Sequence, residues 1–131
     1  MGLDQAMIIA GVGCRRGARA SEIEAAVAQA LAECKLAANA LGLIASAETK
    51  ADEAGIVDAA AALGARLVLV SQAALVEAGE RAITKSGRVQ ELIGIPSVAE
   101  AAALAAGGPD TRLLAPRIVV GPVTCALGEA P

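Results

Sequence analysis

The chain has 131 residues, of which 56% are hydrophobic, and it contains no Phe, Tyr, Trp or His. The missing residue types exclude a Ser-His-Asp triad, histidine metal ligands and aromatic platforms that stack nucleobases. The formal net charge of −3 argues against general affinity for nucleic acid. Any chemistry must therefore use carboxylates, arginine, lysine, hydroxyls, thiols and backbone amides.

The length suits a single domain, residues 1–131, with a core built from Ala, Val, Leu and Ile. The longest uncharged stretches are shorter than the ~20 residues needed to span a bilayer. The cysteines (Cys14, Cys34 and Cys125) form an odd set without a Cys-x-x-Cys pair, which argues against a disulfide framework or a zinc site. We therefore expect a cytoplasmic protein with no membrane segment, no bound metal and no cofactor.

Apolar runs alternate with helical patterns along the chain. Strands are predicted, in chain order, at residues 7–10, 41–47, 67–70, 112–115, 118–120 and 123–127. Five helices are predicted. The first begins at residue 21, the second ends at about residue 63, and the third follows residue 71. The fourth runs from the polar residues 84–87 to residue 93, and the fifth covers residues 98–106. Ser21 with Glu24, and Ser97 with Glu100, have the spacing of capping boxes.

This alternation predicts an α/β fold with three layers, in which helices cover both faces of a β-sheet. The last two predicted strands are joined by Gly121-Pro122, so they form an antiparallel hairpin. A hairpin added to strands that alternate with helices makes the sheet mixed rather than wholly parallel.

The glycine-rich loop expected at residues 11–17 stands where α/β proteins bind anions, between a strand and a helix N-terminus. It contains Gly11, Gly13 and Gly17, but neither the dinucleotide fingerprint nor the Gly-Lys-Ser/Thr of a phosphate loop. Its adjacent Arg15 and Arg16 fit the recognition of carboxylate or phosphate groups, which guanidinium forks bind bidentately. The alternative is a solvated turn whose glycines serve backbone geometry alone.

Polar residues after the second strand form another candidate site. Lys50 is suited to holding an anion, and Asp52 or Glu53 to acting as a general acid or base, although acids before a helix more often act as caps. Cys14 lies near a helix start, where a thiol can become reactive, but no histidine is present to serve as its base. A small buried side chain is therefore the favoured interpretation of Cys14.

Four motifs together resemble a known family. They are Gly11-Val12-Gly13-Cys14-Arg15-Arg16-Gly17 with Ser21-Glu22-Ile23, Leu43-Ile44-Ala45-Ser46 with Lys50-Ala51-Asp52-Glu53 and Gly55, Pro96-Ser97-Val98-Ala99-Glu100-Ala101-Ala102, and Gly121-Pro122-Val123-Thr124. In this order, they are similar to the CobE family and to the C-terminal domain of CbiG, the cobalt-precorrin-5A hydrolase. The resemblance implies a three-layer α/β/α domain that works in cobalamin biosynthesis, by the aerobic pathway for stand-alone members.

The resemblance also implies a ligand, a precorrin or corrinoid edged with acetate and propionate carboxylates. The residues then expected to bind it are Gly11, Gly13, Cys14, Arg15, Arg16, Ser46, Lys50, Ser97, Arg117 and Thr124. Two alternatives are a hydrolase acting on a lactone-bearing precorrin, with Asp52 or Glu53 activating water, and a module that docks onto another enzyme of the pathway. Residues 84–87 depart from the family pattern, which leaves their role open.

Overall fold

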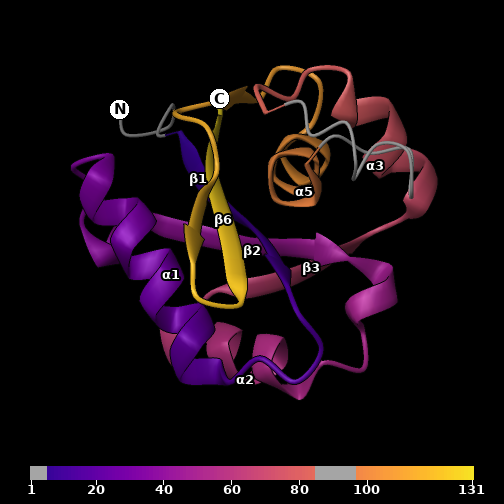
Figure 1. Ribbon diagram of the computed structural model, residues 1–131. Coiled ribbons are helices and arrows are strands. Elements are labelled where there is room, and N and C mark those ends of the chain that lie inside the picture. Colours follow the sequence, from indigo (N-terminus) through magenta and orange to yellow (C-terminus); the bar gives the residue numbers. More distant parts are fainter. Residues whose placement is uncertain (1–5, 85–96) are drawn as a thin grey trace.

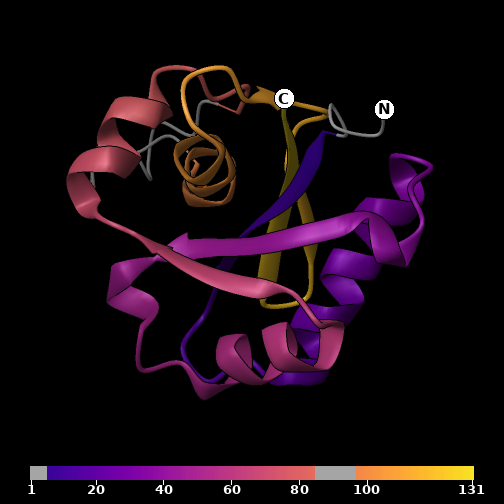
Figure 2. The same ribbon diagram turned by 180° about the vertical axis from the view of Figure 1, so that it is seen from behind.

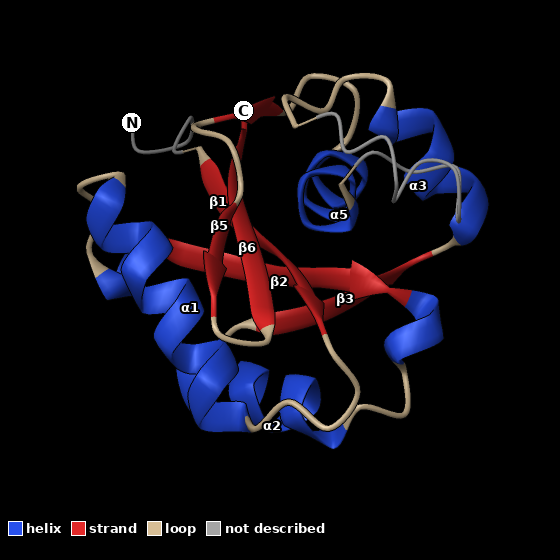
Figure 3. Cartoon of the chain, viewed as in Figure 1, coloured by secondary structure: helices blue, strands red, loops and turns tan. Residues whose placement is uncertain are grey.

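The computed structural model describes residues 6–84 and 97–131, and within them a six-stranded mixed sheet forms the middle of the molecule (Figures 1 and 3). The strand order is β3-β2-β1-β6-β4, and β5 pairs with β6 outside this path. The strands are β1 (Met7–Cys14), β2 (Leu41–Ala47), β3 (Arg66–Val70), β4 (Arg112–Leu113), β5 (Ile118–Val120) and β6 (Val123–Ala130). β1 pairs in parallel with β2 and β2 with β3, whereas β6 runs antiparallel to β1, β4 and β5.

Helices cover both faces of the sheet. They are α1 (Ala20–Glu33), α2 (Ala54–Leu63), α3 (Gln72–Gly79) and α5 (Val98–Gly107), with 3₁₀ turns at Ala38–Ala40 and Glu48–Lys50. Figures 1 and 2 show α1 and α2 on one face and α3 and α5 on the other. The expected α/β class, with three layers and a mixed sheet, is confirmed.

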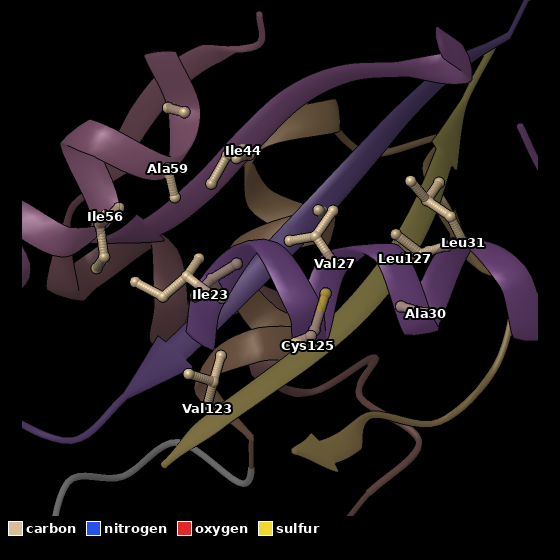
Figure 4. Packing of buried hydrophobic residues seen from close by; sticks show 14 of the residues in the cluster. Ile23, Val27, Ala30, Leu31, Ile44, Ile56, Ala59, Val123, Cys125 and Leu127 are labelled. Atoms are coloured by element: carbon tan, nitrogen blue, oxygen red, sulfur yellow. The ribbon is translucent and has the colours of Figure 1, made fainter. Parts of the chain in front are cut away.

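Each face has its own aliphatic core. On the first, Ile23 and Val27 of α1 and Ile56 of α2 pack with Ile44 of β2 and Cys125 of β6, all completely or almost completely buried (Figure 4). The second core is smaller in side-chain volume, because α5 contributes mostly alanine: Ala101, Ala102 and Ala103. Close approach of backbones thus replaces the bulk that aromatic rings supply in other proteins.

The structure extends β1 beyond the predicted strand. Its pairing with β6 runs from Met7 opposite Ala130 to Cys14 opposite Val123, so residues 11–14 belong to the strand and the loop begins at Arg15. The capping box predicted at Ser21 and Glu24 is also wrong. α1 begins at Ala20, and the Glu22 carboxylate accepts a hydrogen bond of 2.9 Å from the backbone N–H of Arg19.

Most of the other predicted elements are found. β2 and β5 have the predicted bounds, α2 ends at Leu63 before Gly64, and Ser71 and Ser97 cap α3 and α5 through their side-chain oxygens. β6 continues to Ala130, and β4 is shorter than predicted. The helix predicted from the polar residues 84–87 to residue 93 lies, apart from Thr84, outside the described residues. In the described ranges, no helix has the length and apolar character to cross a membrane.

Candidate ligand-binding site

Most of the predicted site residues lie at one edge of the sheet, near the ends of β1 and β2 and the starts of α2, α5 and β6. Because β1, β2 and β3 are parallel, their carboxyl ends lie together there, and α1, α2 and α3, which follow them, begin there. α5 also begins at this edge, since its first residue Val98 lines the same hollow as Gly13 and Cys14. This is the edge at which open α/β sheets bind ligands.

One hollow at this edge carries positive charge and, among the residues that the structure describes, has no acid in its lining. It has a volume of about 260 Å³, and we call it the arginine hollow. Its lining residues are Gly13, Cys14, Arg15, Val98, Arg117, Val119, Gly121, Pro122 and Thr124. Val119 exposes 64% of its surface. The hollow therefore combines two guanidinium groups with an aliphatic wall.

A second hollow lies on the other side of the loop after β1, and we call it the acidic hollow. It has a volume of about 620 Å³, and its lining residues are Arg16, Gly17, Ala18, Thr49, Asp52, Glu53, Ala54 and Gly55. Arg16 here shares its surroundings with two carboxylates. The two adjacent arginines predicted to act together thus line different hollows.

Backbone contacts hold the loop between the two hollows. The N–H of Arg15 donates to the carbonyl oxygen of Pro122 at 3.0 Å, and the N–H of Gly17 donates to Glu53 Oε1 at 2.8 Å. Gly17 has φ +82°, a conformation that favours glycine. A Cβ on Gly55 would overlap the carbonyl oxygen of Ala18, so α2 packs closely against the loop. The loop is therefore held on one side by the turn before β6 and on the other side by α2.

The two glycines expected to admit a ligand differ in their surroundings. A Cβ on Gly11 would overlap the carbonyl oxygen of Ala99, so this glycine allows α5 to lie directly on β1. Gly13 lines the arginine hollow, and a Cβ there would lie 2.7 Å from Thr124 Oγ1. The structure brings Gly13, but not Gly11, to the hollow.

The three predicted hydroxyl groups are also in different situations. Ser46 is completely buried and donates to the carbonyl oxygen of Val12 at 2.7 Å, which joins β2 to β1. Ser97 is buried as the N-cap of α5. Thr124 is half-buried, donates to the carbonyl oxygen of Gly13 at 3.3 Å and lines the arginine hollow. Thr124 is therefore the hydroxyl placed to meet a ligand.

The candidate catalytic groups are in ordinary structural surroundings. Glu53 is the N-cap residue of α2, and its carboxylate accepts the Gly17 bond, while Asp52 is exposed in the acidic hollow. Burial raises the pKa of the Cys14 thiol; Lys50 opposes this and Glu53 adds to it. Cys14 is thus a neutral thiol near neutral pH. Among the described residues, no group of three or more potential metal ligands occurs.

The state of Cys14 gives a testable expectation. A neutral, half-buried thiol should react slowly with an alkylating agent, because the thiolate is the reactive form. Alkylation of the parent protein by iodoacetamide at neutral pH, followed by mass spectrometry, should modify Cys14 more slowly than a free cysteine. Rapid alkylation of Cys14 would show a thiolate and restore it as a candidate nucleophile.

Sequence reasoning missed two features of the edge. Val119 looked like an ordinary strand residue, and only its 64% exposure beside Arg117 shows an aliphatic surface open to a ligand. Glu100 looked like a helix-capping residue, yet its carboxylate bonds to Thr84 and to the backbone of Arg117. Valine is an ordinary residue for a strand and glutamate for the first turn of a helix, so the sequence carries no signal of either feature.

The fold and the edge define a three-layer α/β/α protein with a hollow that contains two arginines at the carboxyl ends of its parallel strands. A family model described as "Cobalamin synthesis G C-terminus" matches residues 8–128, so the chain belongs to this family of cobalamin biosynthesis proteins.

Individual relatives agree with the family. The chain is 33% identical over 120 residues to "Protein CobE" from a Sinorhizobium species, covering 92% of this chain and 78% of the relative. A crystal structure of CobE, described as a protein from the cobalamin (vitamin B12) biosynthetic pathway, superposes with a TM-score of 0.88 at 31% identity and covers 96% of this chain and 92% of that one. The chain is also 32% identical over 101 residues, or 77% of its length, to the cobalt-precorrin-5A hydrolase of Priestia megaterium, but spans only 26% of that protein.

Proposed function

We propose that this protein binds a carboxylate-bearing precorrin or corrinoid intermediate of cobalamin biosynthesis in the arginine hollow and hands it on to the next enzyme. The observation that carries the proposal is the lining of the hollow, in which the described residues place Arg15 and Arg117 beside aliphatic side chains and include no acid. Membership of a cobalamin biosynthesis family supports the choice of ligand.

The chemistry of such a ligand matches the hollow. A precorrin is an apolar macrocycle with acetate and propionate groups around its edge. Arginine forks bind carboxylates bidentately, and Val98, Val119 and Pro122 offer aliphatic contact to the ring. A volume of about 260 Å³ is below the usual range for a site that encloses a whole ligand. The hollow would therefore hold one side of the macrocycle, with the rest lying across the edge toward Lys50 and Arg16.

Charge reversal in the hollow tests the proposal. The variant carrying both Arg15→Glu and Arg117→Glu should bind cobyrinic acid about a hundredfold more weakly, because ligand carboxylates would meet like charges. The measurement is an absorbance titration, which the protein barely disturbs because it contains no Trp or Tyr. Arg16→Glu alone should have a smaller effect, since Arg16 already faces Asp52 and Glu53.

The matched control reverses two charges at the opposite edge of the sheet. Lys35, after α1, and Arg66, at the start of β3, are both exposed, so Lys35→Glu with Arg66→Glu changes the net charge equally. This control should bind like the parent. Cobinamide, whose peripheral groups are amides, should bind more weakly than cobyrinic acid. Equal affinity of the parent and the Arg15, Arg117 variant for cobyrinic acid would disprove the site.

Mass spectrometry and co-purification distinguish the two alternative functions. A change in the mass of a lactone-bearing precorrin over many turnovers, lost in Asp52→Asn or Glu53→Gln, would indicate the hydrolase. Absence of corrinoid affinity, together with co-purification of another enzyme of the pathway, would indicate a docking module.

A further inference from the structure

A completely buried carboxylate lies in the first turn of α5. Glu100 has no exposed surface, and its two carboxylate oxygens accept hydrogen bonds from Thr84 and Arg117. Oε1 accepts from the backbone N–H of Thr84 at 2.7 Å, and Oε2 accepts from the Thr84 hydroxyl at 2.6 Å and from the backbone N–H of Arg117 at 2.8 Å. Burying a charge is costly unless donors compensate it, so such an arrangement needs a reason.

The donors come from segments far from Glu100 in the chain. Thr84 lies beyond the end of α3, and Arg117 stands directly before β5. Glu100 therefore fixes the backbone of Arg117 relative to α5, whose first residue Val98 lines the arginine hollow together with Arg117. The bond uses the amide of Arg117 and leaves its guanidinium to meet a ligand.

We infer that Glu100 is a positioning residue of the arginine hollow, which sets the place of Arg117 and thereby the affinity for the carboxylates of the ligand. This inference rests on the proposed function. Glu100 itself does not line the hollow. It acts through the backbone of Arg117.

The ionisation of Glu100 agrees with this geometry. Burial on its own would raise the pKa of the carboxyl group, but the hydrogen bonds from Thr84, Arg117 and Ile83 outweigh it and hold the pKa below its ordinary value. The position in the first turn of α5, at the positive end of the helix dipole, favours the same charged form. The carboxylate therefore keeps accepting the Arg117 bond at neutral pH.

Glu100→Gln tests the inference with almost no change of shape. A carboxamide has one accepting oxygen, so it can accept from the N–H of Thr84 or of Arg117 but not from both, and its NH₂ group then faces a donor. Thr84→Val is the matched control, because it removes the hydroxyl bond and leaves the Arg117 bond in place. We expect Glu100→Gln to weaken cobyrinic acid binding about tenfold and Thr84→Val less than about twofold.

A double-variant cycle separates positioning from general destabilisation. If Glu100 acts through Arg117, then Glu100→Gln should cause no further loss of affinity in an Arg117→Gln background. A further tenfold loss there, or parental affinity in Glu100→Gln alone, would overturn the inference while leaving the proposed function intact. A parent protein that does not bind cobyrinic acid would overturn both.

Amide hydrogen exchange in the parent protein provides a measurement that needs no variant. The N–H of Arg117 should be protected from exchange by its bond to Glu100, as measured by NMR. Exchange at the rate of an unbonded peptide group would refute the inference even if Glu100→Gln fails to fold.

Discussion

Gly11→Ala is expected to lower the free energy of unfolding by about 3 kcal/mol, because the new methyl group has no space. It would overlap the carbonyl oxygen of Ala99 and lie 2.8 Å from the backbone nitrogen of Ala103. Both atoms belong to the backbone of α5, so relief requires the whole helix to move away from β1. Urea unfolding followed by far-UV circular dichroism measures the change, since the chain has no Trp or Tyr to report by fluorescence.

Gly42→Ala is the matched control on the neighbouring strand β2. Its Cβ would meet Met7 Cγ at 2.9 Å, but this is a flexible side chain that is 45% exposed and can turn away. The free energy of unfolding should therefore change by less than about 0.5 kcal/mol. If Gly11→Ala proved as stable as Gly42→Ala, the close contact between α5 and β1 would not hold in solution.

The pairing of β1 with β6 explains where the prediction of β1 stopped short. Glycines after an apolar run usually signal a loop, and the sequence does not show that Gly11 and Gly13 lie opposite Ala126 and Thr124 of β6. That pairing joins residues more than a hundred positions apart, so no local pattern encodes it. β2 was predicted with its bounds because it is a buried apolar run ending in a polar stretch, which is a local signal.

The candidate site was predictable as an edge of the sheet but not as a set of side chains. Loops after parallel strands must meet at one edge, which brought Arg15 and Lys50 to the same end of the molecule, and the hairpin between β5 and β6 brings Thr124 there as well. Which arginine lines which hollow depends on the geometry of a five-residue turn, and that separated Arg15 from Arg16. Ser46 was misplaced for another reason, because a hydroxyl bonded across two buried strands has the same sequence pattern as one facing a ligand.

Glu100 shows most clearly which contacts the sequence does not predict. Ser97 does cap α5, by accepting from the N–H of Glu100, so the predicted box is half present. The carboxylate, however, bonds to Thr84 and Arg117, which are 16 and 17 residues away in opposite directions along the chain. A capping box satisfies a helix end locally, whereas these bonds join three separate segments.

The stability of the protein should consequently depend on the ionisation of Glu100. Its pKa is lowered in the folded state, so the folded protein favours the carboxylate more than the unfolded chain does. The resulting stabilisation is fully present above the ordinary pKa of glutamate, about 4.3, and is lost as the pH falls through the lower pKa of the folded state. Acid should therefore destabilise the parent through this group.

Glu100→Gln isolates that contribution. At pH 7 the variant should unfold with about 2 kcal/mol less free energy than the parent, because a buried donor loses its charged acceptor. As the pH falls below the pKa of Glu100 in the folded protein, the difference in unfolding free energy between variant and parent should shrink, because protonated Glu100 then resembles the amide. Asp58→Asn, which removes an exposed carboxylate from α2, should leave the unfolding free energy within about 0.5 kcal/mol at pH 7. A Glu100→Gln difference that stays constant across the acid range would mean that the hydrogen bonds stabilise the fold without depending on the charge of Glu100.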